Sequence, residues 1–193
     1  MPKPKIVLAS RSKPRKKLLR QIGLTFTVAG SAVRERRRVK TSCIDLVVEN
    51  ALRKARDVVR RYPDDIVIGA DTVVLVGKKI IGKPRNLADA ARTLKLLSRK
   101  PQWVYSGIAV IDGPTGRVFT AHEKTKIYLY PLTDAQIRAY FRRVSPLDKA
   151  GSFDVQGFGS MFIDRIEGCF YNVVGLPLAK LAKILLQLGM DIF

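Results

Sequence analysis

The chain has 193 residues, with 36 Lys and Arg against 16 Asp and Glu, and 47% of its residues are hydrophobic. This length fits one domain, and this apolar share excludes a disordered chain. Cys43, Cys169 and His122 are too few for a disulfide framework or a structural zinc site. No apolar run reaches the roughly 18 residues of a membrane helix, and no signal peptide precedes Ser10. We therefore expect a soluble cytoplasmic protein with no membrane partner.

The formal net charge of +20 predicts attraction to polyanions such as nucleic acids, nucleotides or phosphorylated substrates. The basic residues concentrate near the N-terminus, in the runs 11–17 and 34–38. Such runs are also typical of solvated surfaces, and that is the simpler interpretation of Arg36–Arg38.

Hydrophobic periodicity and turn residues predict the elements of the N-terminal half. A strand at 5–9 precedes a helix from Pro14 to Gln21, and a second strand covers 25–29. Thr41 or Ser42 caps a long amphipathic helix that ends before Pro63. The apolar run 66–70 predicts a central strand with Asp71 at its end. A hairpin at 73–81 and a helix from Asn86 to Leu97 follow.

The C-terminal half continues the alternation of strands and helices. Strands are predicted at 103–111 and 118–129, joined by a turn at 113–116, and a capping box at Thr133 opens a helix to Arg143. A glycine-rich loop at 144–160, a strand at 162–166 and a helix at 178–188 complete the chain. This order predicts an α/β fold: a single domain over residues 1–193, with a twisted mixed β-sheet flanked by helices and a substrate cleft at the strand ends.

Several polar residues occupy positions where chemistry is expected. The segment 10–17 joins a strand to a helix N-terminus and carries hydroxyls and cations, which suits a phosphate or a merely basic helix face. Asp71 follows a buried strand, so it is either a carboxylate at the sheet edge where open α/β sheets bind ligands or a capping or turn residue. Lys54 shares the inner stripe of its helix, so it either extends out to solvent or faces a polar cavity.

Three further residues are ambiguous from the sequence alone. Glu35 within an arginine run is either ion-paired or a metal ligand. Lys83 precedes a proline at a strand end and is on its own a surface lysine. Gln156 lies in the glycine-rich loop, where an amide can contact a base edge or do nothing.

Taken together, short segments in a specific order resemble the Maf family of nucleoside triphosphate pyrophosphatases from Ile6 to about Gly189. The segments, in chain order, are Leu8-Ala9-Ser10-Arg11-Ser12-Lys13-Pro14-Arg15-Lys16-Lys17-Leu18-Leu19, Arg34-Glu35, Lys54-Ala55, Gly69-Ala70-Asp71-Thr72, Gly82-Lys83-Pro84, Leu147-Asp148-Lys149-Ala150-Gly151, Val155-Gln156-Gly157 and Val174-Gly175-Leu176-Pro177-Leu178.

The resemblance implies a Maf/ITPase-like fold and an enzyme that cleaves nucleoside triphosphates between the α- and β-phosphates, releasing pyrophosphate with Mg²⁺ or Mn²⁺. It implies that Asp71 accepts the proton of the attacking water and that Glu35 and Asp71 hold the metal. It also implies a triphosphate site and catalytic cations, formed by Ser10, Ser12, Lys13, Arg15, Lys54 and Lys83. Members of the family are often homodimers.

Thr72 and Gln156 resemble the dTTP/UTP branch of the family, because a glutamine amide can pair with the donor and acceptor edge of a pyrimidine. The chain departs from the pattern at Lys13 and Pro14, which replace the family's proline and first arginine, and at Arg34, which replaces an acid. Three explanations of this departure are open: Lys13 substitutes for the arginine, the loop is shifted by one residue, or the substrate specificity is broader than that of the dTTP/UTP branch.

Two alternatives to a pyrimidine nucleotide pyrophosphatase remain at this point. One is a nucleic-acid-binding or division-regulating protein that uses its basic surface, with non-specific nucleic-acid affinity at low salt. The other is a purine pyrophosphatase acting on ITP or XTP, which shares the chemistry and differs only in substrate.

Overall fold

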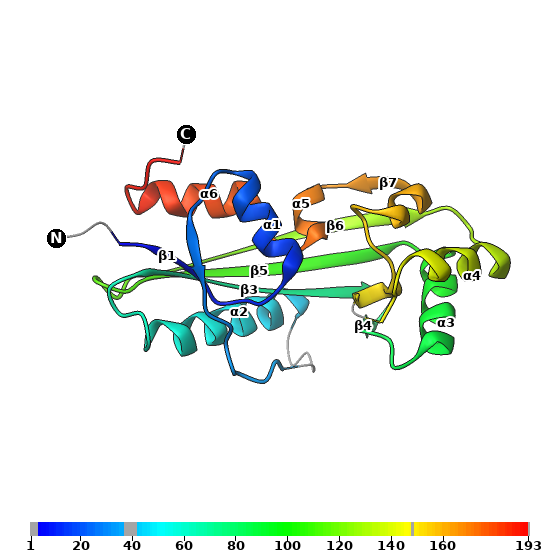
Figure 1. The fold of residues 1–193 in the computed structure, drawn as a ribbon, viewed down its shortest axis with the longest axis horizontal. Helices are drawn as coiled ribbons and strands as arrows, with labels where there is room; N and C mark the ends of the chain where they lie inside the picture. Colours follow the sequence, from blue (N-terminus) through cyan, green and yellow to red (C-terminus); the bar gives the residue numbers. More distant parts are fainter. Residues whose placement is uncertain (1–3, 37–41, 148, 193) are drawn as a thin grey trace. The chain divides into compact units, whose positions relative to one another are not determined.

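The computed structural model describes residues 4–36, 42–147 and 149–192. Over these ranges, seven strands form one mixed sheet in the order β2-β1-β3-β5-β6-β7, with β4 paired to β3 (Figure 1). The chain separates into two compact units: the first comprises Met1–Thr72, Ser106–Glu123 and Val174–Phe193, and the second Val73–Tyr105 and Lys124–Val173. The α/β class is confirmed, while the extent of a single domain over 1–193 stays a prediction.

Parallel strands form the centre of the first unit. β1 (Ile6–Leu8) pairs in parallel with β2 (Phe26–Val28) on one side and with β3 (Ile66–Val76) on the other. In this register Leu8, the last residue of β1, lies beside Ile68. β3 therefore continues well past the end of its parallel neighbour.

Helices cover both faces of the sheet in the first unit. α1 (Lys13–Gln21) and α6 (Leu178–Gln187) lie on one face, and α2 (Cys43–Val59) lies on the other (Figure 1). Alternation along β1 separates the two cores, because Leu8 packs with the α1 and α6 side chains while Val7 packs with those of α2.

Close contact between α2 and β3 depends on Gly69. A Cβ atom at this position would lie 2.2 Å from the backbone oxygen of Ala51. Real atoms do not approach that closely, so only glycine lets the α2 backbone lie directly on the strand.

The second unit has its own core on one face of its strands. β4 (Lys79–Ile81) pairs antiparallel with β3, and β7 (Ile163–Glu167) pairs antiparallel with β6 (Val118–Leu129). Leu94, Val104 and Ile127 belong to the core. The remaining elements are α3 (Leu87–Leu97), β5 (Gln102–Asp112), α4 (Asp134–Arg143), the short 3₁₀ helices Ala150–Ser152 and Phe158–Phe162, and α5 (Phe170–Val174).

Most predicted elements and caps are confirmed. The side chain of Ser42 accepts a hydrogen bond from the backbone N–H of Asp45 and caps α2, and Thr133 forms the predicted capping box with Gln136. Thr41, the alternative cap, lies outside the described residues. The short helix α5 was not predicted.

Candidate functional site

Asp71 lies within a strand rather than at its end, so the predicted end of the strand at residue 70 is wrong. β3 runs without interruption to Val76. The physical reason is that β3 keeps partners after β1 stops at Leu8: Val74 to Val76 pair with β4. Asp71 therefore lies within β3 but beyond the end of its parallel neighbour β1. Asp71 lies past the carboxyl end of β1, the side of an open α/β sheet on which ligands bind, and the residue is buried, with 4% of its surface exposed.

Lys54 faces a polar group rather than extending to solvent. The residue is 8% exposed, on the side of α2 that packs against β3. Its Nζ donates hydrogen bonds to Asp71 Oδ1 at 2.7 Å, to Glu35 Oε1 at 2.6 Å and to the backbone oxygen of Ala70 at 3.2 Å. The two carboxylates more than compensate the charge of the buried ammonium, because the three groups together carry one net negative charge.

Asn50 is part of this cluster, and the sequence analysis did not identify it. Its Nδ2 donates to Asp71 Oδ2 and to the backbone oxygen of Arg36, and its Oδ1 accepts from the backbone N–H of Arg36, each at 2.9 Å. Asn50 precedes Lys54 by four residues, so the two share one face of α2. That spacing was the only available signal.

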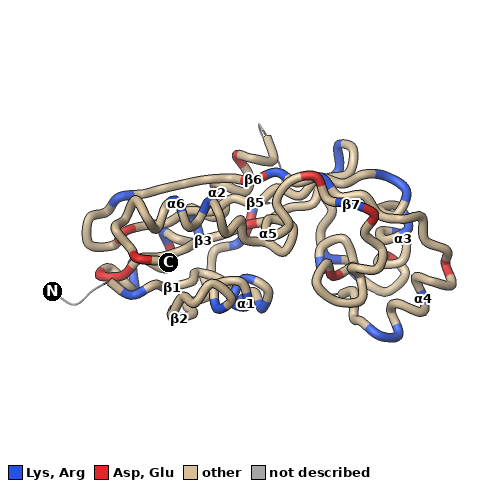
Figure 2. The backbone as a smooth tube through the Cα atoms, turned by 90° about the horizontal axis from the view of Figure 1, so that it is seen from above, with Lys and Arg blue, Asp and Glu red and all other residues tan. Residues whose placement is uncertain are grey.

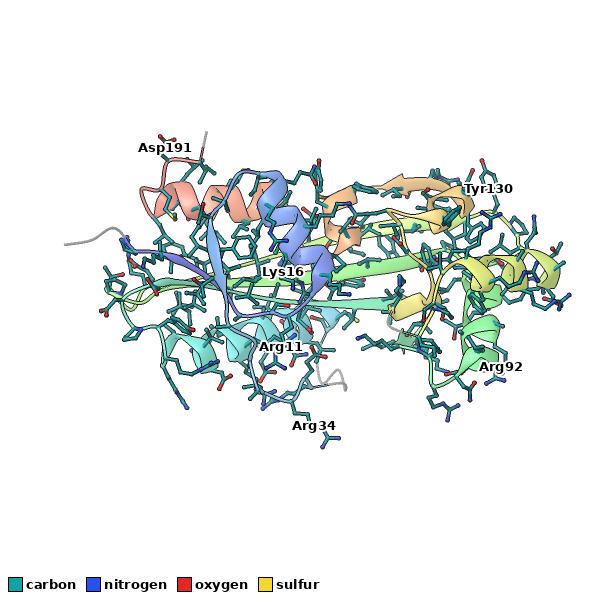
Figure 3. The ribbon with its side chains drawn as sticks, in the orientation of Figure 1. Arg11, Lys16, Arg34, Arg92, Tyr130 and Asp191 are labelled. Carbon is teal, nitrogen blue, oxygen red and sulfur yellow. The ribbon has the colours of Figure 1, made fainter. Side chains whose placement is uncertain are left out.

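Glu35 belongs to a segment that is partly exposed. Its side chain is 52% exposed, and its bond to Lys54 makes it ion-paired, one of the two options left open by the sequence. Arg34 extends away from the ribbon (Figure 3), while Arg36 pairs with Glu49. Arg37 and Arg38, the rest of the basic run, lie outside the described residues.

Arg15 is buried and bonded to protein groups. Its guanidinium donates to the backbone oxygens of Gly175 at 2.8 Å and Ala70 at 3.0 Å, to Thr72 Oγ1 at 3.0 Å and to Ser10 Oγ at 3.3 Å. Burial lowers the pKa of Arg15, and the negative charges of Asp71 and Glu35 oppose that effect. The side chain thus links three segments of the first unit.

Hydroxyl groups surround this guanidinium. Thr72 Oγ1 also lies 2.8 Å from Ser106 Oγ, and Ser10 Oγ accepts a hydrogen bond from the backbone N–H of Ser12 at 3.3 Å. Ser12 is the N-cap residue of α1, and Lys13 and Pro14 are exposed in its first turn. The helix predicted from Pro14 to Gln21 is therefore confirmed, with its start one residue earlier, at Lys13.

The structure brings part of the predicted set together. Arg15 and Lys54 both donate to the backbone oxygen of Ala70, which joins their partners into one hydrogen-bonded cluster of the first unit. This cluster contains Ser10, Ser12, Arg15, Glu35, Lys54, Asp71 and Thr72. Lys83 and Gln156 belong to the second unit, where both are exposed. The backbone N–H of Gln156 donates to Asp154 Oδ1 at 2.8 Å, which leaves its amide group outside that contact.

The donor set of the cluster favours hard cations. Asp71 and Glu35 supply carboxylate oxygens around a position that already holds the positive charge of Lys54. Among the described residues, no group of three His, Cys, Asp or Glu side chains could hold a metal ion by itself. Over the same ranges, every helix is too short or too polar to cross a membrane.

Comparisons with known proteins identify relatives over nearly the whole chain. The model of the Maf-like protein family matches residues 5–188. A protein of Bacillus cereus (strain ATCC 10987 / NRS 248) named dTTP/UTP pyrophosphatase is 43% identical over 188 residues, covering 97% of this chain and 92% of its own. A protein of Dictyoglomus turgidum with the same name is 41% identical over 185 residues, covering 95% and 96%.

Solved structures extend the comparison to the fold. A HAM1 protein from Coxiella burnetii has a TM-score of 0.54 and 15% identity, with 95% of this chain and 99% of that chain covered. The Ham1 protein of Staphylococcus aureus gives 0.53 and 15%, with 96% and 100% covered. The predicted ITPase-like fold is thereby confirmed.

Proposed function

The chain belongs to the Maf-like protein family, and on that premise we propose that it is a nucleoside triphosphate pyrophosphatase acting on dTTP and UTP. It hydrolyses the bond between the α- and β-phosphates to give the monophosphate and pyrophosphate. Its relatives named dTTP/UTP pyrophosphatase support this substrate class. The observation that carries the proposal is the cluster of Asp71, Lys54 and Glu35 in the first unit.

Asp71 is the proton acceptor in this mechanism. Each of its carboxylate oxygens accepts one hydrogen bond, from Lys54 or from Asn50, and keeps a further lone pair. The carboxylate takes the proton of a water molecule whose oxygen attacks the α-phosphorus. The bond from that phosphorus to the bridging oxygen breaks, and pyrophosphate leaves with the electron pair.

Lys54 and the other basic residues bind and orient the triphosphate. Phosphoryl transfer needs positioning and neutralisation of charge more than covalent chemistry. Lys54, Lys83, Lys13, Ser10 and Ser12 are the groups that we assign to the phosphates. Arg15 contributes by holding Ser10 and Thr72 in place through its hydrogen bonds.

A divalent cation, Mg²⁺ or Mn²⁺, fits the donor set of the site. Asp71 and Glu35 would hold it, with phosphate oxygens completing the shell, as is usual for Mg²⁺ sites with few protein ligands. When bound, such a cation supplies neutralisation of phosphate charge and polarisation of the phosphoryl oxygens.

Thr72 and Gln156 are assigned to substrate choice. The hydroxyl of Thr72 is fixed by Arg15 and Ser106, and the exposed amide of Gln156 can both donate to and accept from a pyrimidine edge. Pro14 offers no polar group to a base or phosphate, so this position does not contribute through its side chain.

The test is release of pyrophosphate from a panel of nucleotides that includes dTTP, UTP, ITP and XTP, with Mg²⁺ or Mn²⁺ and with EDTA as control. We expect metal-dependent turnover that favours dTTP and UTP. Turnover of ITP and XTP alone would keep the chemistry and overturn the substrate class. Failure to turn over any of the nucleotides would overturn the proposed function.

We also propose that the protein is located in the cytoplasm and assembles as a homodimer. Among the described residues both cysteines, Cys43 and Cys169, are free thiols, which supports a reducing compartment. Sedimentation of the purified protein tests the dimer directly.

A further inference from the structure

One face of the strands in the second unit carries alternating aromatic and basic side chains. Because side chains alternate along a strand, Trp103 and Tyr105 share a face that is opposite to the core residue Val104. The same alternation on β6 places Ile127 in the core and its neighbours on the other face. We call this surface the aromatic face; it consists of Trp103, Tyr105, Lys124, Lys126, Tyr128 and Arg165.

The cations of the aromatic face lie over its rings. Lys124 Nζ is 3.8 Å from the centroid of Trp103 and 5.6 Å from that of Tyr105. Lys126 Nζ is 4.8 Å from the centroid of Tyr128, and the guanidinium carbon of Arg165 is 3.6 Å from it. Lys126 Nζ also lies 5.3 Å from the centroid of Trp103, so the contacts connect all six side chains into one continuous patch of cation–π pairs.

The patch carries a net positive charge. Glu167 lies opposite Lys126 on β7 and accepts hydrogen bonds from Tyr128 and Arg165. Asp164 also pairs with Arg165, at 3.2 Å. The three cations of this surface therefore have two carboxylate partners, which leaves one net positive charge. Lys and Arg positions along β6 and β7 can be followed in Figure 2.

We propose that the aromatic face binds single-stranded nucleic acid. Its rings would stack on bases while the ammonium groups of Lys124 and Lys126 move from the rings to phosphates. Aromatic platforms interleaved with cations are the arrangement that binds single strands without reading their sequence. Positions two residues apart on a strand are separated by about 6.6 Å, a spacing that suits the bases of an extended strand.

Charge argues against a second copy of the chain as the occupant. A symmetric contact through this face would bring Lys124, Lys126 and Arg165 against the same cations of another molecule. The chain also carries a formal net charge of +20, so this contact would bring like charges together. A polyanion with flat rings complements both properties of the surface. This inference goes beyond the pyrophosphatase proposal and does not depend on it.

The single tryptophan of the chain makes the test direct. Fluorescence of Trp103 is titrated with oligo(dT), with oligo(rU) and with a duplex of equal length, each of about 12 nucleotides, within the site sizes of known single-strand binders. The titrations are repeated between about 50 and 200 mM KCl. We expect both single strands to quench Trp103 and the duplex to leave its emission unchanged.

Two variants separate stacking from charge. Tyr105→Leu should weaken binding of the single strands by about 5- to 150-fold, the cost of one lost stacked base, and keep the salt dependence. Lys124→Ala/Lys126→Ala should lower the slope of log affinity against log salt by about 1.4, which is the loss of two phosphate contacts. The matched control Lys100→Ala/Arg142→Ala removes equal charge outside the aromatic face and should keep the slope. Far-UV circular dichroism verifies the fold of each variant.

Three results would overturn the inference. The first is binding of oligonucleotides without quenching of Trp103. The second is an equal loss of slope in the two double variants, which would make the affinity a property of overall charge. The third is a concentration-dependent change of Trp103 emission without oligonucleotide, matched by dimer formation in sedimentation, which would assign the face to a second copy.

Discussion

The ammonium of Lys54 lies 2.7 Å from Asp71 Oδ1, and both groups are almost completely buried. Two segments separated in sequence thus meet at one ion pair, and Glu35 adds a second carboxylate to the same ammonium. The pair is the centre of the cluster. Its integrity determines both activity and stability in the predictions that follow.

Asp71→Asn should lower pyrophosphate release by about 10²- to 10⁴-fold, because an amide cannot accept the proton of the attacking water. Binding of dTTP, measured by calorimetry, should remain largely intact. The control is Asp112→Asn, another buried aspartate of the first unit, which pairs with Arg117 outside the cluster. Near-full activity of Asp71→Asn would refute the assignment of the proton acceptor.

Lys54→Met should lower the free energy of unfolding by about 3–5 kcal/mol, since it leaves the buried Asp71 carboxylate without its counter-charge. The double variant Lys54→Met/Asp71→Asn should recover most of that loss, because asparagine carries no charge. Urea unfolding of the four proteins gives the coupling energy. The control Lys95→Met breaks an exposed pair with Asp134 and should change stability very little. Additive losses in the Lys54/Asp71 double-mutant cycle would contradict the ion pair between these two residues.

Asn50→Asp should move the acidic limb of the profile of kcat/KM against pH to higher pH. The new carboxylate would lie beside Asp71, and two neighbouring carboxylates hold a proton more readily than one. Asn50→Leu removes the hydrogen bond to the Asp71 carboxylate without adding charge, so it should lower kcat and move the limb in the same direction by a smaller amount. Identical profiles for both variants would show that the added carboxylate does not act on Asp71.

Gln156→Glu should reduce kcat/KM for UTP relative to ITP by about tenfold, the order expected when a donor to a buried acceptor is lost. A carboxylate accepts hydrogen bonds but cannot donate them as the amide does. Gln187→Glu, at an exposed position of α6 in the first unit, introduces the same charge as a control. An unchanged ratio would remove Gln156 from substrate recognition.

Asp57 should contribute stability that is lost in acid. Hydrogen bonds from the Ser31 side chain and the Ala32 backbone lower the pKa of Asp57 below its ordinary value. The contribution is therefore fully present above the unfolded pKa of about 3.9 and disappears as the pH falls through the lower folded value. Thermal unfolding should show Asp57→Asn below the wild type at pH 7 and equal to it in strong acid; a constant difference would contradict this.

Local patterns were enough to predict most elements and part of the cluster. The alternation along β1 repeats every two residues and the apolar stripe of α2 every three to four, and both repeats can be recognised directly in the sequence. The same stripe identified Lys54 as unusual, because a cation on an inward face requires a partner. The capping residues Ser42 and Thr133 were found for a similar reason: their bonds are made within the first helical turn.

Contacts between distant segments could not be predicted. Arg15 looks like any basic residue of a charged helix, and only the fold shows that Ala70 and Gly175 supply its acceptors. The position of Asp71 depends on where β1 ends, which no residue near Asp71 encodes. Asn50 was missed because its partners, Arg36 and Asp71, lie on separate segments.

The hydrogen atom that serves as the side chain of Gly69 has a consequence for mutational tolerance. Because the backbone oxygen of Ala51 occupies the space of a Cβ atom, a single added methyl group would push α2 away from β3. Asn50 directly precedes Ala51 and Lys54 follows it by three residues on that helix, so both would move with it, away from Asp71. A substitution of Gly69 by alanine would thus remove activity without changing any charged group. A mutational screen restricted to polar residues would not find this position.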